Sequence, residues 1–125
     1  MLSDHTPAAV VATKDLQRAR SFYEGMLGLV GEPSMEGFSY RAGDASIFVY
    51  PSQFAGTNQA TALSFGLPSE AFDEEVAILR NAGITFDTFE AEGLDWSDGV
   101  ASAEGFKSVW FSDPDGNVLN ITSQG

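Results

Sequence analysis

Hydrophobic and polar positions along the chain repeat one order of elements twice. Residues 7–13 are small, apolar and partly β-branched, which predicts a buried strand. Apolar residues at helical spacing follow, from Asp15, whose side chain can cap the helix, to Gly28, which can end it. Strand patterns come next at residues 37–42, which alternate, and at 45–50, which are nearly all apolar. The first half of the chain is therefore expected to hold a strand, a helix and further strands.

The second half restarts this plan after a polar stretch at residues 51–59, which we interpret as a linker. Ser69 can cap the second helix and Gly83 can end it. Asp15 and Glu70 each lie 13 residues before the glycine that ends their helix, which indicates an internal duplication at a spacing of roughly 55 residues. The other predicted elements of this half are strands at 60–67 and 84–89, a long loop at 90–105, strands at 106–112 and 117–122, and a turn at 113–116.

Length and composition fit one small α+β domain, residues 1–125, made of two tandem β-α-β-β-β repeats. The 125 residues are 43% hydrophobic and include ten Phe and two Trp, enough to fill a core. We place repeat one at about residues 7–50 and repeat two at about residues 60–123. No apolar run approaches the ~18 residues of a membrane span, and the N-terminal residues lack a signal-peptide pattern. With no Cys for disulfides or thiolate metal sites, these features predict a cytoplasmic protein without membrane association.

The charge of the chain is strongly acidic and unevenly distributed. A formal net charge of −12 argues against nucleic acid as a partner, because phosphate binding needs a basic face. The same field favours a cationic ligand, although many acidic residues serve only solubility. No basic residue lies between Arg80 and Lys107. The acidic residues within that gap are Asp87, Glu90, Glu92, Asp95, Asp98 and Glu104.

Two motifs near the ends of the chain resemble the vicinal oxygen chelate superfamily. This superfamily contains glyoxalase I, extradiol dioxygenases, fosfomycin-resistance enzymes and bleomycin-resistance proteins. Its first-helix pattern is similar to the segment that runs through Lys14-Asp15-Leu16, Ser21-Phe22-Tyr23 and Leu27-Gly28-Leu29. Its last hairpin is similar to Trp110-Phe111 followed by Asp113-Pro114-Asp115-Gly116-Asn117. Residues 50–58 and 93–100 also resemble a bacterial subgroup of small glyoxalase-like proteins.

The resemblance implies that each repeat curls into a half-barrel and that two half-barrels form a cupped, incomplete β-barrel with the helices outside. Members bind ligands inside this cup and usually pair, so a homodimer is expected. Catalytic members hold a divalent metal on the cup floor. The positions of the metal ligands correspond here to Ala8, to one of Ala60, Ala62 and Ser64, and to Asn120. None of these side chains is an imidazole or a carboxylate.

The residue types in the chain argue against a metal without reference to any family. Transition-metal sites use imidazole, thiolate and carboxylate ligands, and this chain has one His and no Cys. His5 is expected to be a solvated residue near the terminus. A two-His site would need both copies of His5 at the two-fold axis of a dimer, with a carboxylate beside them. We therefore expect no metal and no cofactor.

The candidate ligand-binding residues are those that the fold could direct into the cup, namely Asn120, Tyr40, Phe48, Tyr50, Trp96 and Trp110. The amide of Asn120 could orient a polar ligand, or Asn120 could be a buried residue satisfied within the protein. Strand alternation sends about half of the strand aromatics into the cup and the rest into the core. Trp96 lies between Asp95 and Asp98 in the long loop. That loop is either a lid suited to a cationic ring or amine, or an exposed acidic loop with Trp96 packed on the body.

These features favour a metal-free small-molecule-binding protein of the bleomycin-resistance type, with its ligand held in the β-cup. The ligand is expected to be a small organic molecule, and a cationic or aromatic one would suit the acidic charge and the aromatic residues. The alternative is a glyoxalase-like lyase or isomerase with a displaced metal site or a metal-free mechanism. A third hypothesis is a protein-interaction module, whose cup would be filled by large side chains.

Overall fold

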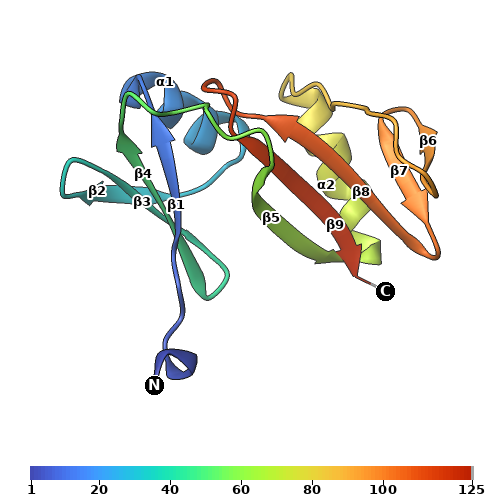
Figure 1. The fold of residues 1–125 in the computed structure, drawn as a ribbon, viewed down its shortest axis with the longest axis horizontal. Coiled ribbons are helices and arrows are strands. Elements are labelled where there is room, and N and C mark those ends of the chain that lie inside the picture. Colours follow the sequence, from blue (N-terminus) through green and yellow to red (C-terminus); the bar gives the residue numbers. More distant parts are fainter. Residues whose placement is uncertain (125) are drawn as a thin grey trace. The chain divides into compact units, whose positions relative to one another are not determined.

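The computed structural model describes residues 1–124 and divides into two compact units. Unit 1 comprises residues 1–59 together with the turn at 113–117, and unit 2 comprises residues 60–112 and the chain from 118 onward. Each unit combines one open sheet with a helical segment, so the fold is α+β as predicted (Figure 1).

Unit 1 contains a strand, a helix and three strands, the order of the predicted repeat, although no strand was predicted at residues 31–34. Its elements are a 3-10 turn η1 (Leu2–Asp4), β1 (Ala9–Thr13), α1 (Leu16–Arg20), the π-helical turn η2 (Ser21–Met26), β2 (Gly31–Ser34), β3 (Gly37–Ala42) and β4 (Ala45–Pro51). The strand order is β1-β4-β3-β2, with β1 parallel to β4 and the other pairs antiparallel. The Asp15 side chain accepts a hydrogen bond from the Arg18 backbone N–H, so the predicted cap is present. Gly28 takes the left-handed conformation, with φ +72°, after the helical segment.

The two faces of the unit 1 sheet differ sharply in burial. Val11, Tyr40, Ile47 and Val49 are buried on the face toward the helical segment, where the Tyr40 ring stacks on Tyr23 at 5.9 Å. Cross-strand partners share a face. Ser39 and Val10 both pair with Phe48, so all three residues lie on the opposite face. We call this second side the open face of unit 1.

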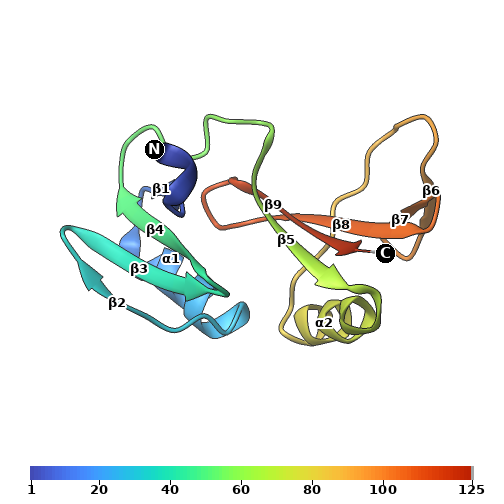
Figure 2. The same ribbon diagram turned by 90° about the horizontal axis from the view of Figure 1, so that it is seen from below.

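Unit 2 contains a strand, a helix and four strands, one more than the predicted repeat. Its elements are β5 (Thr61–Pro68), α2 (Ser69–Asn81), β6 (Asp95–Ser97), β7 (Val100–Ala103), β8 (Phe106–Ser112) and β9 (Val118–Gln124). The strand order is β5-β9-β8-β7-β6, with β5 parallel to β9. Figure 2 shows α2 along one face of this sheet. The helix buries Phe72, Val76 and Leu79, and the buried strand residues are Val109, Phe111, Leu119 and Ile121.

The structure corrects three sequence predictions in this unit. Residues 84–89 do not form a strand, because only Asp87 pairs with Trp110 on the edge of β8 that β7 also uses. The predicted loop at 90–105 contains the β6–β7 hairpin, whose turn residues Asp98 and Gly99 have φ of +54° and +79°. Ser69 is the first residue of α2, and Pro68 occupies the N-cap position that Ser69 was expected to take. Among the described helices, none is both long and apolar enough to cross a membrane.

Candidate functional site

The Asp113–Asn117 turn is a buried polar network of unit 1. The Asp113 carboxylate is 5% exposed and accepts hydrogen bonds from the Tyr23 hydroxyl at 2.7 Å and the Asn117 side-chain amide at 2.8 Å. It also accepts from the backbone N–H groups of Asp115 and Asn117, each at 2.9 Å. Burial, followed by the adjacent Asp113 carboxylate, raises the pKa of Tyr23 above its usual range, so the phenol remains a neutral donor.

The second carboxylate of the turn fixes the start of the helical segment. Asp115 accepts hydrogen bonds from the Thr13 hydroxyl at 2.6 Å and the Lys14 backbone N–H at 2.9 Å, and it pairs with Arg18 at 3.0 Å. Its side chain is 1% exposed. The two motifs that carry the family resemblance are therefore joined within unit 1. Hydrogen bonds and an ion pair to the carboxylates of Asp113 and Asp115 connect the turn to the helical segment.

The open face of unit 2, the side of the sheet away from α2, carries Asn120. Ser64, Trp110 and Asn120 are cross-strand partners and share this face. The Asn120 side-chain oxygen accepts a hydrogen bond from the Ser64 hydroxyl at 2.6 Å, and its nitrogen donates to the Val109 carbonyl at 3.1 Å. Asn120 is 8% exposed, so its amide is satisfied within unit 2, whereas Ser64 beside it is exposed.

Three aromatic rings gather on the same face of unit 2. Phe89 lies edge-on to Trp96 at 5.3 Å and to Trp110 at 4.9 Å, and the two Trp rings are 6.0 Å apart. Phe89 is 46% exposed, and both Trp side chains are half-buried. Of the two alternatives for the acidic loop, the structure has Trp96 packed on the body of unit 2. We call Phe89, Trp96 and Trp110 the aromatic cluster.

The open face of unit 1 carries a second aromatic pair. The rings of Phe48 and Tyr50 lie parallel, with an interplanar angle of 2° and 5.9 Å between centroids, and Tyr50 is exposed. Tyr40 does not join them. It pairs with Ile47 rather than with Phe48, so it lies on the other face of the sheet and points into the core. Its hydroxyl donates to Glu24 at 2.8 Å, and burial together with this carboxylate raises the pKa of Tyr40 above its usual range. Tyr40 is therefore corrected from a candidate ligand contact to a core residue.

The positions to which the resemblance assigns metal ligands lack suitable side chains here. Ala8, Ala62 and Ser64 offer methyl and hydroxyl groups, and the Asn120 amide is hydrogen-bonded within its sheet. Within residues 1–124, no three His, Asp or Glu side chains come together in an arrangement that could hold an ion. The residues present do not fit a divalent transition metal.

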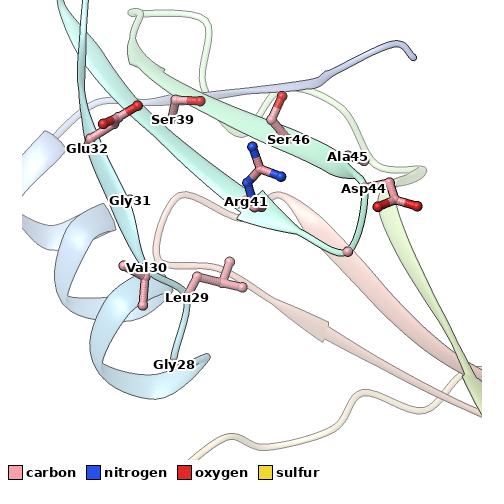
Figure 3. A pocket seen from close by; sticks show the side chains of 11 residues that line it. Gly28, Leu29, Val30, Gly31, Glu32, Ser39, Arg41, Asp44, Ala45 and Ser46 are labelled. Carbon is pink, nitrogen blue, oxygen red and sulfur yellow. The ribbon is translucent and has the colours of Figure 1, made fainter.

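A pocket in unit 1 was not predicted from the sequence. It has a volume of about 840 Å³ and lies between the segment that follows the helix and the β3–β4 hairpin (Figure 3). The polar side chains that line it are those of Glu32, Ser39, Arg41, Asp44 and Ser46. The alternation of Ser39 and Arg41 along β3 was the available signal, because it puts both residues on one face. The sequence did not indicate that this face borders a cavity.

No family model and no curated protein matches this sequence, but many solved structures share the fold. A glyoxalase/bleomycin resistance protein/dioxygenase from Alicyclobacillus acidocaldarius is 16% identical with a TM-score of 0.72, covering 96% of this chain and 91% of its own. A fosfomycin resistance protein from Mesorhizobium loti is 12% identical with a TM-score of 0.70, covering 98% and 93%. A lactoylglutathione lyase from Agrobacterium tumefaciens is 17% identical with a TM-score of 0.67, covering 95% and 92%. At these identities the likeness shows the fold alone.

Proposed function

We propose that this chain, which has the fold of the vicinal oxygen chelate superfamily, is a metal-free binding protein of the bleomycin-resistance type. Its ligand is a small aromatic organic cation that lies on the aromatic cluster. The observation that carries the proposal is the cluster itself, in which one exposed and two half-buried rings remain on the open face of unit 2. Aromatic rings of this kind bind flat ligands by stacking and bind cations through their faces.

Charge supports the cationic character of the ligand. Asp87 pairs with Trp110 across the sheet and so lies on the same face as the cluster. Asp95 is next to Trp96 on β6 and so points to the opposite face, and the Arg80 guanidinium donates to the Asp98 backbone carbonyl. Asp87 is therefore the carboxylate that supports a cation at the cluster. Carboxylates at the edge of an aromatic surface attract a cation and disfavour an anion.

Asn120 and Ser64 form the polar side of this site. Because the Ser64 hydroxyl gives its hydrogen to Asn120, its oxygen remains an acceptor for an N–H group of the ligand. Asn120 thus orients the Ser64 hydroxyl and acts on the ligand only through that hydroxyl. We also propose that the chain acts as a homodimer, which static light scattering of the purified protein would measure.

The binding test uses the two Trp residues, both of which belong to the cluster, so that intrinsic Trp fluorescence reports on this site alone. The probes are proflavine, a cationic tricyclic, and acridine, a matched tricycle that is uncharged in mildly alkaline buffer. We expect saturable quenching and a calorimetric signal with proflavine, and binding at least about tenfold weaker with acridine.

A matched pair of variants locates the binding. Phe89→Ala removes the exposed ring of the cluster, whereas Phe54→Ala removes an exposed ring from a loop of unit 1. We expect only Phe89→Ala to weaken proflavine binding, by about fivefold or more. The alternative, a lyase or isomerase, is supported by the names of structural neighbours such as the lactoylglutathione lyase. One bound divalent ion per chain by elemental analysis, with turnover of a glutathione adduct and no proflavine binding, would reject the binding proposal.

A further inference from the structure

The unit 1 pocket contains a cation that has no counter-ion. Arg41 lies on the open face of β3, and Figure 3 shows its guanidinium pointing into the pocket between Ser39 and Ser46. Among the residues that the structure describes, its side chain makes no hydrogen bond and no ion pair. By contrast, Arg18 and Arg20 each pair with a carboxylate. In a chain with six basic and 18 acidic residues, an exposed Arg side chain that lines a pocket without a carboxylate partner is available to an anionic group.

An unpaired carboxylate faces the same pocket. Glu32 is the cross-strand partner of Ser39 and therefore shares the open face, and its carboxylate points into the pocket in Figure 3. No ion pair within 4.0 Å joins Glu32 to any cation in residues 1–124. Asp44 also lines the pocket, but its side chain points away from Arg41 at the hairpin tip. The interior of the pocket thus presents one positive and one negative group that do not neutralise each other.

The remaining lining suits a polar ligand of small-molecule size. The hydroxyls of Ser39 and Ser46 lie on either side of Arg41 and make no hydrogen bond within the described chain. Each can donate to an anion that the guanidinium holds. A volume of about 840 Å³ is within the range of small-molecule sites.

From this arrangement we infer that the unit 1 pocket binds a small zwitterion, whose carboxylate lies against Arg41 between Ser39 and Ser46 and whose ammonium group lies toward Glu32. Arg recognises carboxylates through paired N–H donors, and the two serines extend that set. Glu32 confers selectivity, because it repels a plain anion and attracts an amine. No residue of this site belongs to the aromatic cluster, and its existence does not depend on the proposed function.

The test is a titration of isotope-labelled protein followed by amide chemical shifts. Three probes of the same chain length are compared at equal ionic strength: 6-aminohexanoate with both charges, hexanoate with the anion alone, and hexylamine with the cation alone. We expect 6-aminohexanoate to shift the amides of residues 28–32 and 39–46 saturably. We expect hexanoate and hexylamine to bind there at least about fivefold more weakly.

Three variants assign the two charges. Arg41→Met should weaken 6-aminohexanoate about tenfold or more, because it removes a charge-assisted contact. Glu32→Gln should abolish the preference for 6-aminohexanoate over hexanoate. Glu36→Gln, the matched control in the exposed β2–β3 turn outside the pocket lining, should leave both affinities unchanged. All three residues are exposed strand or turn positions, and the amide spectrum shows directly whether each variant is folded.

Two results would overturn the inference. One is the absence of shifts at residues 28–32 and 39–46 with 6-aminohexanoate. The other is equal binding of hexanoate and 6-aminohexanoate to the unaltered protein. In the first case, shifts confined to residues 89–110 would show that 6-aminohexanoate binds at the aromatic cluster instead.

Discussion

The hydrogen bond between Tyr23 and Asp113 allows a quantitative test of how unit 1 is held together. Tyr23→Phe removes the hydroxyl that donates to the Asp113 carboxylate at 2.7 Å and keeps the ring. The ring contacts with Phe22 at 5.0 Å and Tyr40 at 5.9 Å can therefore persist. Tyr23 is 0% exposed, so water cannot replace the lost donor without rearrangement. The change isolates one buried, charge-assisted hydrogen bond.

A hydrogen bond to a charged group contributes about 1.5–3 kcal/mol to stability. The lower part of this range applies, because Asp113 keeps three other donors, from Asp115 N–H, Asn117 N–H and the Asn117 side chain. We expect Tyr23→Phe to lower the free energy of unfolding by about 2 kcal/mol. Urea unfolding followed by circular dichroism would measure this as a lower midpoint at an unchanged slope.

Tyr50→Phe is the matched control for this measurement. Tyr50 is an exposed strand residue whose hydroxyl has no hydrogen-bond partner among residues 1–124, so its removal should change stability by less than about 0.5 kcal/mol. If Tyr23→Phe and Tyr50→Phe unfold at the same urea concentration, the network around Asp113 does not stabilise the protein, and the reasoning is refuted.

Two further predictions concern pH and backbone space. Burial raises the pKa of Tyr23 above its ordinary value of 10.0, so the unfolded chain loses this proton at a lower pH than the folded protein does. The free energy of unfolding should therefore fall as pH rises above about 10. Urea midpoints measured over a pH series would contradict this if they fell no more steeply for the unaltered protein than for Tyr23→Phe. Gly37→Ala should cost more than about 2 kcal/mol, since a Cβ there would lie 2.1 Å from the Val49 carbonyl oxygen. Gly25→Ala is the helical control, because a Cβ there meets nothing within 4 Å. It should be neutral or stabilise by up to about 1 kcal/mol. Equal thermal midpoints for Gly37→Ala and Gly25→Ala would contradict the packing argument.

Local chemistry accounts for the elements that the sequence predicted correctly. Asp15 caps its helix, and Gly43 and Asp44 form the two-residue turn between β3 and β4. The turn at 113–116 ends with Gly116 at φ +91°. The helix cap and the two turns each depend on the residue types at a few neighbouring positions, so the sequence alone can predict them. The same local motifs carried the resemblance to the vicinal oxygen chelate superfamily, whose fold the solved structures share.

Elements that depend on their neighbours were missed. The edge strand β2 contains Pro33, a residue that argues against a strand unless its lost N–H faces away from the sheet. Residues 84–89 alternate like a strand, but only Asp87 pairs with β8, on the edge that β7 uses at residues 106–108. The Asp98-Gly99 pair was a usable signal for the β6–β7 hairpin, because this dipeptide favours the two-residue turn found there.

The sequence by itself determined the duplication, the main strands and helices, the turn chemistry and the lack of metal-ligating side chains at the positions that the resemblance assigns to a metal. Only the tertiary structure decided which side of each strand is open. Alternation separates Tyr40 from Ser39 and Arg41, but it does not say which set meets the helix, because that depends on where the helical segment packs. Burial of Tyr23 against Tyr40 directed Tyr40 into the core and left Arg41 facing a pocket. The candidate sites are therefore properties of packing, which brings together side chains that no local pattern connects.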